Sequence, residues 1–104
     1  MKPISHPAQN DISLASVLYA LGDPIRLKIV QQLAQEGEKA CGAFGCATPK
    51  STMSHHFRIL REAGLIHSRK SGTHYINTLR RADLDARFPQ LLDVVLASIG
   101  SDKG

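Results

Sequence analysis

The sequence predicts a mainly α-helical domain that carries one β-hairpin, an α+β fold with about five helices. Three observations support this prediction. Large apolar residues recur at spacings of three and four in four separate stretches, which is typical of helices with one buried face. Two pairs, Asp-Pro and Thr-Pro, have the chemistry of helix starts. One glycine-containing stretch has the composition of two strands joined by a tight turn.

The chain has 104 residues, which is enough for one hydrophobic core and too few for a second. Residues 1–10 are polar, contain two prolines and lack periodicity, so we expect a mobile N-terminal arm there. Residues 11–100 then form the single folded domain, and residues 101–104 a flexible tail. The first helix is expected over residues 11–22, because one apolar stripe runs along it through Ile12, Leu14, Leu18 and Leu21.

A second helix is predicted from Pro24 to about Gln35. Asp23 can act as its N-cap, and a proline at the first helical position loses nothing by lacking an N–H group. The run CGAFGCATP over residues 41–49 is short and contains two glycines. At most one weak helical turn is expected there.

A third helix is predicted from the Thr48-Pro49 pair to Ala63, with Gly64 as its C-terminal stop. At 100° per residue its two faces differ in chemistry. The apolar face holds Met53, Phe57 and Leu60, which we expect in the core. The opposite face is polar and mostly basic, with Ser51, His55, Arg58 and Glu62 flanked by Ser54 and Arg61.

A basic hairpin and a last helix complete the domain. Residues 65–70 and 73–79 are predicted strands, joined by a tight turn at Ser71-Gly72, where glycine supplies a positive φ. After a short turn at residues 83–87, Pro89 can open a helix with a long apolar stripe. A domain of this size has limited core to cover that stripe, so we expect a partner subunit. The stripe comprises Phe88, Leu91, Leu92, Val95, Leu96 and Ile99.

Charge and hydropathy narrow the class of protein. The formal net charge is +4, and residues 48–81 hold seven basic residues against one acid. A basic segment of this kind indicates binding to a polyanion, most often nucleic acid, the alternative being a solvated basic face. No apolar run approaches the roughly 18 residues of a membrane span, which argues against a membrane protein. Without a secretory signal at the N-terminus, we expect a cytoplasmic protein.

The order helix, helix, loop, helix, hairpin, helix, with SHHFRILREAGLI leading into SRKSGTHYINTL, resembles the winged helix-turn-helix of the arsenic-repressor (ArsR) family of bacterial transcription factors. LGDPIRLKIVQQLA is similar to that family's second helix, residues 48–64 to its recognition helix and residues 65–79 to its wing. The resemblance covers nearly the whole chain. It implies a homodimer, built mainly from the first and last helices, that binds a palindromic operator near a promoter and usually represses it. The implied dimer residues are Ile12, Leu14, Leu18, Leu91, Leu92, Val95, Leu96 and Ile99.

The predicted partner is double-stranded DNA. A helix fits the major groove, where short polar side chains reach base edges and arginine pairs with guanine or phosphate. His56 and His67 are expected to be structural, and Tyr75 to be a cross-strand packing residue. The predicted DNA-binding residues are Lys50, Ser51, Thr52, Ser54, His55, Arg58 and Arg61 on the helix, and Arg69, Lys70, Thr73 and His74 on the hairpin.

Cys41 and Cys46 are the only cysteines and have four residues between them. In arsenic and soft-metal sensors of the ArsR family, one residue normally separates the two thiolates. Other metal sensors of that family bind through histidines and carboxylates on the last helix, and no histidine follows His74 here. We therefore expect no resident cofactor. Three interpretations stay open: structural thiols, a disulfide that acts as a redox switch, or a soft-metal site completed by His55 or His56.

Two other classes of function were weighed against DNA binding. A small thiol-dependent enzyme or metal-trafficking protein would use both cysteines and the His55-His56 pair. Nothing marks an oxyanion site or a substrate cleft, and the glycines lack phosphate-loop spacing, so we expect no enzyme. A protein-interaction module built on the last helix would leave the basic segment unexplained.

Overall fold

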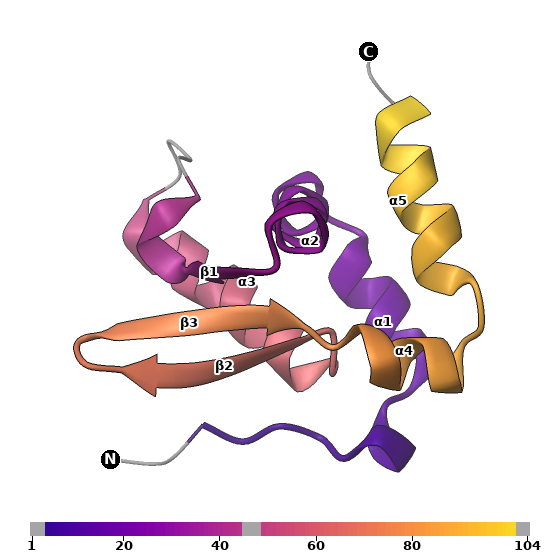
Figure 1. Cartoon of the computed structure of the whole chain (residues 1–104), viewed down its shortest axis with the longest axis horizontal. Helices are drawn as coiled ribbons and strands as arrows, with labels where there is room; N and C mark the ends of the chain where they lie inside the picture. Colours follow the sequence, from indigo (N-terminus) through magenta and orange to yellow (C-terminus); the bar gives the residue numbers. More distant parts are fainter. Residues whose placement is uncertain (1–3, 45–48, 102–104) are drawn as a thin grey trace.

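The computed structural model describes residues 4–44 and 49–101. Figure 1 shows a long β-hairpin whose base lies against the helices and whose tip points away from the last helix. The predicted order of helix, helix, loop, helix, hairpin and helix is observed. The helices are α1 (Leu14–Leu21), α2 (Pro24–Glu36), α3 (Lys50–Glu62), α4 (Arg81–Arg87) and α5 (Leu91–Ser101), the strands are β1 (Glu38–Ala40), β2 (Ile66–Ser71) and β3 (His74–Leu79), and single 3₁₀ turns span Gln9–Asp11 and Cys41–Ala43.

Side-chain caps fix where α1 and α2 begin. The hydroxyl of Ser13 accepts a hydrogen bond from the backbone N–H of Ser16, so α1 begins later than the predicted residue 11. Asp23 caps α2 as predicted: its Oδ2 accepts from the backbone N–H groups of Ile25 and Arg26 at 2.9 and 3.1 Å. These bonds satisfy N–H groups that have no partner within the helix.

The end of α3 is fixed by Gly64. Its φ of +87° lies in the left-handed region, and a Cβ built on it would lie 2.6 Å from Cγ1 of Ile12. Both the backbone conformation and the close approach therefore require glycine. At the other end of α3, Pro49 is the N-cap and provides no side-chain hydrogen bond. The predicted cap Thr48 lies outside the described residues.

The sheet is antiparallel with strand order β1-β3-β2. Ser71 pairs with His74, so the hairpin turn is Gly72-Thr73, one residue later than predicted. Of these two turn residues only Gly72 has a positive φ, +64°, which is the pattern of a type II′ turn. Strand β1 was not predicted, because three residues of the sequence EKA show no alternation of apolar and polar side chains.

One core joins α1, α2, α3 and the base of the hairpin. Phe57 and Leu60 are buried as predicted, and Met53 packs against them from the rim. Two predicted dimer residues belong to this core instead: Ile12 and Leu92 are each only 1% exposed. A helical stripe shows which face is apolar but not which of its members the chain itself covers.

The described part of the predicted N-terminal arm lies against the hairpin. Residues 4–10 run along β2 in Figure 1, where Nε2 of His6 accepts from the backbone N–H of Ser68 at 3.0 Å. The His6 ring stacks on that of His67, with centroids 4.3 Å apart, and Arg80 donates to the carbonyl after His6 at 2.8 Å. β2 is an edge strand, and an edge strand has backbone N–H groups without partners in the sheet. These groups can bond to the N-terminal segment, and the spacing of apolar residues gives no sign of such a contact.

The C-terminal part contains a short helix where a turn was predicted, and the described residues then hold five α-helices, the number predicted. Residues 83–87, expected as a turn, belong to α4, and α5 begins two residues after Pro89. Arg81 on α4 pairs with Asp93 on α5 and so links the two helices. Over the described residues, every helix is too short or too polar to cross a lipid bilayer.

Candidate nucleic-acid interface

The outward face of α3 is free in this structure. The predicted DNA-binding residues at its N-terminal half are all exposed, whereas Arg61 near its C-terminal end is half-buried. The inner face holds His56, Phe57 and Leu60, each at most 6% exposed. The division into a core face and a polar face is therefore as predicted. The exposed residues are Lys50, Ser51, Thr52, Ser54, His55 and Arg58.

The buried His56 is a structural histidine, as predicted. Its Nδ1 lies 3.2 Å from Nη1 of Arg26 and 3.9 Å from Oδ2 of Asp23. Burial raises the pKa of Asp23, but hydrogen bonds from the backbone N–H groups of Arg26 and Ile25 and the charge of Arg26 outweigh that effect and leave the pKa of Asp23 below its usual value. Asp23 therefore stays ionised as the cap of α2.

The hairpin adds a second exposed basic surface beside α3, which packs against β2. Arg69, Lys70, Thr73 and His74 are all exposed near its tip. Arg69 is also engaged within the chain, since its Nη2 lies 2.9 Å from Oε2 of Glu38. It must leave or share that carboxylate in order to contact a phosphate.

A buried polar chain holds the base of the hairpin. Asn77 on β3 is completely buried; its Oδ1 accepts from the hydroxyl of Ser68 at 2.6 Å, and its Nδ2 donates to the carbonyl of Lys39 at 3.2 Å. Nδ2 also lies 3.2 Å from Sγ of Cys41. These bonds join all three strands and stiffen the base of the wing. This role of Asn77 was not predicted, although an asparagine inside an otherwise β-prone stretch indicates a buried polar contact.

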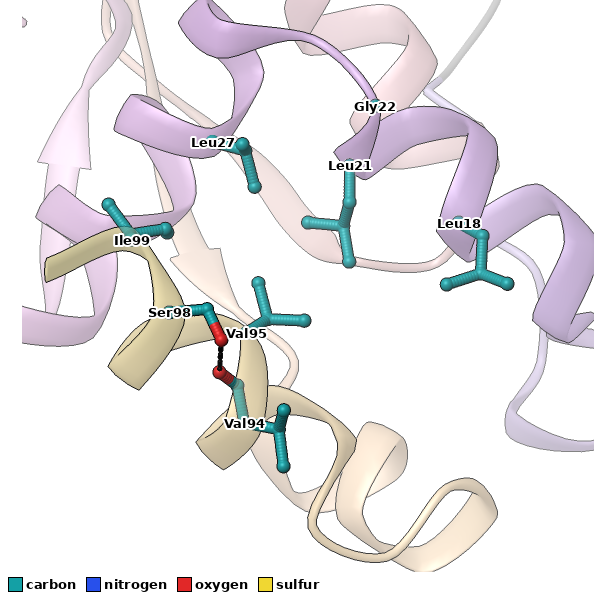
Figure 2. Close-up of a pocket in the computed structure, with 8 residues that line it drawn as sticks. All are labelled: Leu18, Leu21, Gly22, Leu27, Val94, Val95, Ser98 and Ile99. Carbon is teal, nitrogen blue, oxygen red and sulfur yellow. Dashed lines mark hydrogen bonds between the residues drawn. The ribbon is translucent and has the colours of Figure 1, made fainter. Parts of the chain in front are cut away.

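A different surface lies between α1, α2 and α5. Figure 2 shows an apolar groove of about 600 Å³ there, lined by side chains from all three helices. Leu14 and Leu18 on α1 are 46% and 50% exposed, as a dimer surface requires. Tyr19 and Val94, which lie beside the predicted stripes, are 68% and 61% exposed. The groove is lined by Leu18, Leu21, Gly22, Leu27, Val94, Val95, Ser98 and Ile99.

The remaining predicted dimer residues are Leu91, Val95, Leu96 and Ile99. All four are half-buried, and the first three pack against the core. The exposed part of α5 is therefore smaller than its apolar stripe suggested.

Comparisons with known proteins agree with this geometry. A family model described as a helix-turn-helix domain matches residues 21–69. The uncharacterised HTH-type transcriptional regulator YceK of Bacillus subtilis (strain 168) is 40% identical over 85 residues, covering 78% of this chain and 84% of that protein. The crystal structure of the transcriptional repressor BigR from Xylella fastidiosa is 26% identical with a TM-score of 0.64, covering 82% of this chain and 84% of BigR. The chain belongs to the ArsR family.

Membership of the ArsR family settles the class of function. The protein is a DNA-binding transcriptional regulator with a winged helix-turn-helix fold, and ArsR-family regulators are not enzymes. The same fold appears in the crystal structure of another ArsR family transcriptional regulator at 17% identity and a TM-score of 0.67, covering 86% of this chain and 98% of that one. In this ArsR-family chain, α3 is the recognition helix and β2-β3 is the wing.

Cys41 is a free, half-buried thiol beside Asn77, and Cys46 lies outside the described residues. Within residues 4–44 and 49–101, no group of three or more histidine, cysteine or acidic side chains is arranged to hold a metal ion. A disulfide or soft-metal switch in this ArsR-family protein stays a prediction.

Proposed function

We propose that this ArsR-family protein is a homodimeric repressor that binds a palindromic operator in a promoter through α3 and the wing. One observation carries the proposal: α3 buries its apolar face in the core while a continuous row of hydroxyl, imidazole and cationic groups stays exposed. A helix of this kind matches the width of the major groove.

The exposed groups divide by the contacts that they suit. Ser51, Thr52, Ser54 and His55 are short enough to donate to or accept from base edges, and Arg58 can pair bidentately with guanine or grip a phosphate. The wing-tip residues Arg69, Lys70, Thr73 and His74 suit the phosphate backbone or the minor groove. Lys50 and Arg61, at the two ends of α3, suit flanking phosphates.

The homodimer follows from the apolar surface of α1 and α5. Leu14, Leu18, Tyr19 and Val94 are large, and each is at least 46% exposed. A second copy placed by two-fold symmetry would cover the same surface on both chains. Two recognition helices related by that symmetry require two inverted half-sites, which is why we propose a palindromic operator.

Fluorescence anisotropy with a labelled duplex from the gene's own promoter region tests the proposal. Affinity should fall steeply as salt rises, because bound phosphates release counterions. Arg58→Ala should weaken binding by roughly tenfold. Lys28→Ala is the matched control, because it removes the same charge from an exposed position on α2. Arg26 on α2 faces α3, and Lys28 lies about 200° around the helix axis from it, so Lys28 points away from the proposed DNA surface.

Three results would contradict the proposal. Affinity that does not depend on salt, equal losses in the two variants, or transcription in vitro that the protein does not lower would each argue against a repressor that reads DNA through α3. The same assay with reduced and oxidised protein tests the cysteine prediction. A redox switch requires loss of binding on oxidation and recovery with a thiol reductant, and equal binding would favour structural thiols.

A further inference from the structure

The guanidinium of Arg26 is buried where α1, α2 and α3 meet. Arg26 is only 8% exposed, and its Nε donates to the carbonyl of Ala20 at 2.6 Å while Nη2 donates to that of Tyr19 at 3.4 Å. Both carbonyls belong to the last turn of α1, where acceptors lack the usual partner four residues on, although that of Tyr19 also accepts from the backbone N–H of Gly22 at 3.1 Å. A cation at this negative end of the helix dipole stabilises it further. Arg26 therefore fixes the C-terminal end of α1.

The same guanidinium reaches the recognition helix. Its Nη1 lies 3.2 Å from Nδ1 of His56, which is 6% exposed on the inner face of α3. Arginine can only donate, so Nδ1 must accept and the imidazole proton must lie on Nε2. The carboxylate of Asp23 lies 3.9 Å from Nδ1 of His56, but it is already used to cap α2. The bond to Arg26 is thus the direct polar link between α2 and the middle of α3.

This link joins the two surfaces of the proposed repressor. On α3, His56 follows His55 directly and precedes Arg58 by two residues, so moving its ring moves the exposed DNA face. On α1, Tyr19 and Leu18 are exposed in the proposed dimer surface, and the Tyr19 ring lies 5.6 Å from the Arg26 guanidinium carbon. The Arg26 side chain therefore contacts both α1 and α3.

We propose that Arg26 and His56 are positioning residues of the DNA interface, which hold α3 at the angle set by α1. This inference rests on the proposed function above, and it goes further by assigning a role in operator recognition to two side chains that touch no DNA. Loss of the link should lower affinity for the correct sequence, because base contacts depend on the angle of the helix. Binding to phosphates alone should change little, because it tolerates a small shift.

The first test compares His56→Leu with His56→Asn. Leucine fills much of the space and lacks an acceptor, whereas Oδ1 of asparagine is bonded to Cγ, as Nδ1 is in histidine, and can still accept from Arg26. Affinity for the promoter duplex should fall roughly tenfold in His56→Leu and recover largely in His56→Asn. Affinity for an unrelated duplex of equal length should stay nearly constant, and circular-dichroism melts should show folded protein at the temperature of the assay.

The second test uses Arg26→Lys, which keeps the charge but cannot bridge two carbonyls and a ring nitrogen. It should lose promoter affinity as His56→Leu does, and the double variant should be no weaker than either, because both changes break one link. If His56→Leu fails to fold, Arg26→Lys compared with His56→Asn decides the question. In wild type, long-range ¹H–¹⁵N spectra should show the Nε2–H tautomer at His56.

Each outcome separates this inference from the proposed function. Wild-type protein that ignores the promoter duplex would refute the repressor itself. Wild-type protein that binds, together with folded His56→Leu and Arg26→Lys variants that bind equally well, would refute the positioning role alone. Equal losses on both duplexes, or an Nδ1–H tautomer at His56, would also refute it.

Discussion

The two exposed surfaces of this protein differ in chemistry and in what they require. The face of α3 and the wing tip are polar and basic, and water solvates them well in the free protein. The face of α1 and α5 exposes large apolar side chains such as Leu18 and Val94. Exposed apolar area of this kind is costly in water and is usually covered by another protein. The basic surface is therefore stable in water without a partner, whereas the apolar surface favours a partner that stays bound.

This difference separates the two expected interactions experimentally. Binding through the basic face should weaken as salt rises, because it depends on phosphate contacts and counterion release. Association through the apolar face should be nearly insensitive to salt, because it depends on area removed from water. A salt titration of both properties in one sample therefore tells the two interfaces apart.

The largest expected effect comes from placing a charge in the apolar face. Leu18→Asp should raise the dimer dissociation constant by roughly a hundredfold or more, because a carboxylate would be buried against the partner. Sedimentation equilibrium measures this change. Ser54→Asp on α3 is the reciprocal control, which should abolish promoter binding by repelling phosphates and leave the dimer intact. A Leu18→Asp protein with an unchanged sedimentation profile would overturn the assignment of this face.

The spacing of apolar residues predicted the polar face of α3 better than it predicted the exposed apolar surface of α1 and α5. On α3 the spacing of Phe57 and Leu60 identifies the buried side, and the opposite side of the same helix is exposed as expected. Which residues stay exposed on the apolar surface of α1 and α5 depends instead on which distant segments of the chain pack against it. Ile12 is covered by the close approach of Gly64, which no local pattern shows.

The same reasoning explains the other residues that sequence analysis missed. Strand β1 exists because the edge of β3 offers it hydrogen-bond partners, and Asn77 is buried because two neighbouring strands supply its bonds. The link between Arg26 and His56 spans thirty positions of the chain. Such long-range polar contacts have no periodic signature, although His56 was correctly expected to face inward.

The second prediction concerns Gly64, where the N-terminal part of the apolar region packs against the junction of α3 and the wing. Gly64→Ala should lower the free energy of unfolding by about 3 kcal/mol, since it adds a clash with Ile12 to an unfavourable φ. Gly72→Ala is the control: its φ is also positive, but nothing lies within 4 Å of the added Cβ, so about 1 kcal/mol is expected. Urea unfolding measures both, and equal losses would argue against the packing role.

A smaller effect should follow from the ion pair between Arg69 and Glu38, which holds the wing-tip arginine away from DNA. Both side chains are about half exposed. Glu38→Gln frees Arg69 and removes a negative charge, and it should raise promoter affinity about two- to threefold. Asp93→Asn makes the same change of charge at the partner of Arg81, away from the wing, and should have little effect. Anisotropy at low salt compares the two.

The smallest expected effect concerns His6, which attaches the N-terminal segment to the wing. Burial lowers its pKa, and the charges of His67, Arg80 and Arg61 lower it further. The unfolded chain therefore binds a proton more readily than the folded one, and stability should fall as the pH drops through the ordinary imidazole value of about 6.5. Above that value the contribution is constant, because His6 is neutral in both states.

NMR of the Ser68 amide proton follows this change at its origin. A protonated His6 cannot accept through Nε2, so the Ser68 resonance should shift toward a solvent-exposed position as the pH falls, and His6→Gln should remove the transition. The promoter affinity of α3 should hardly change in His6→Gln, because the bond lies at the base of the wing and away from the exposed face. A parallel loss of DNA binding would instead mean that the N-terminal segment belongs to the polar surface, and that surface would then have to include the edge of β2.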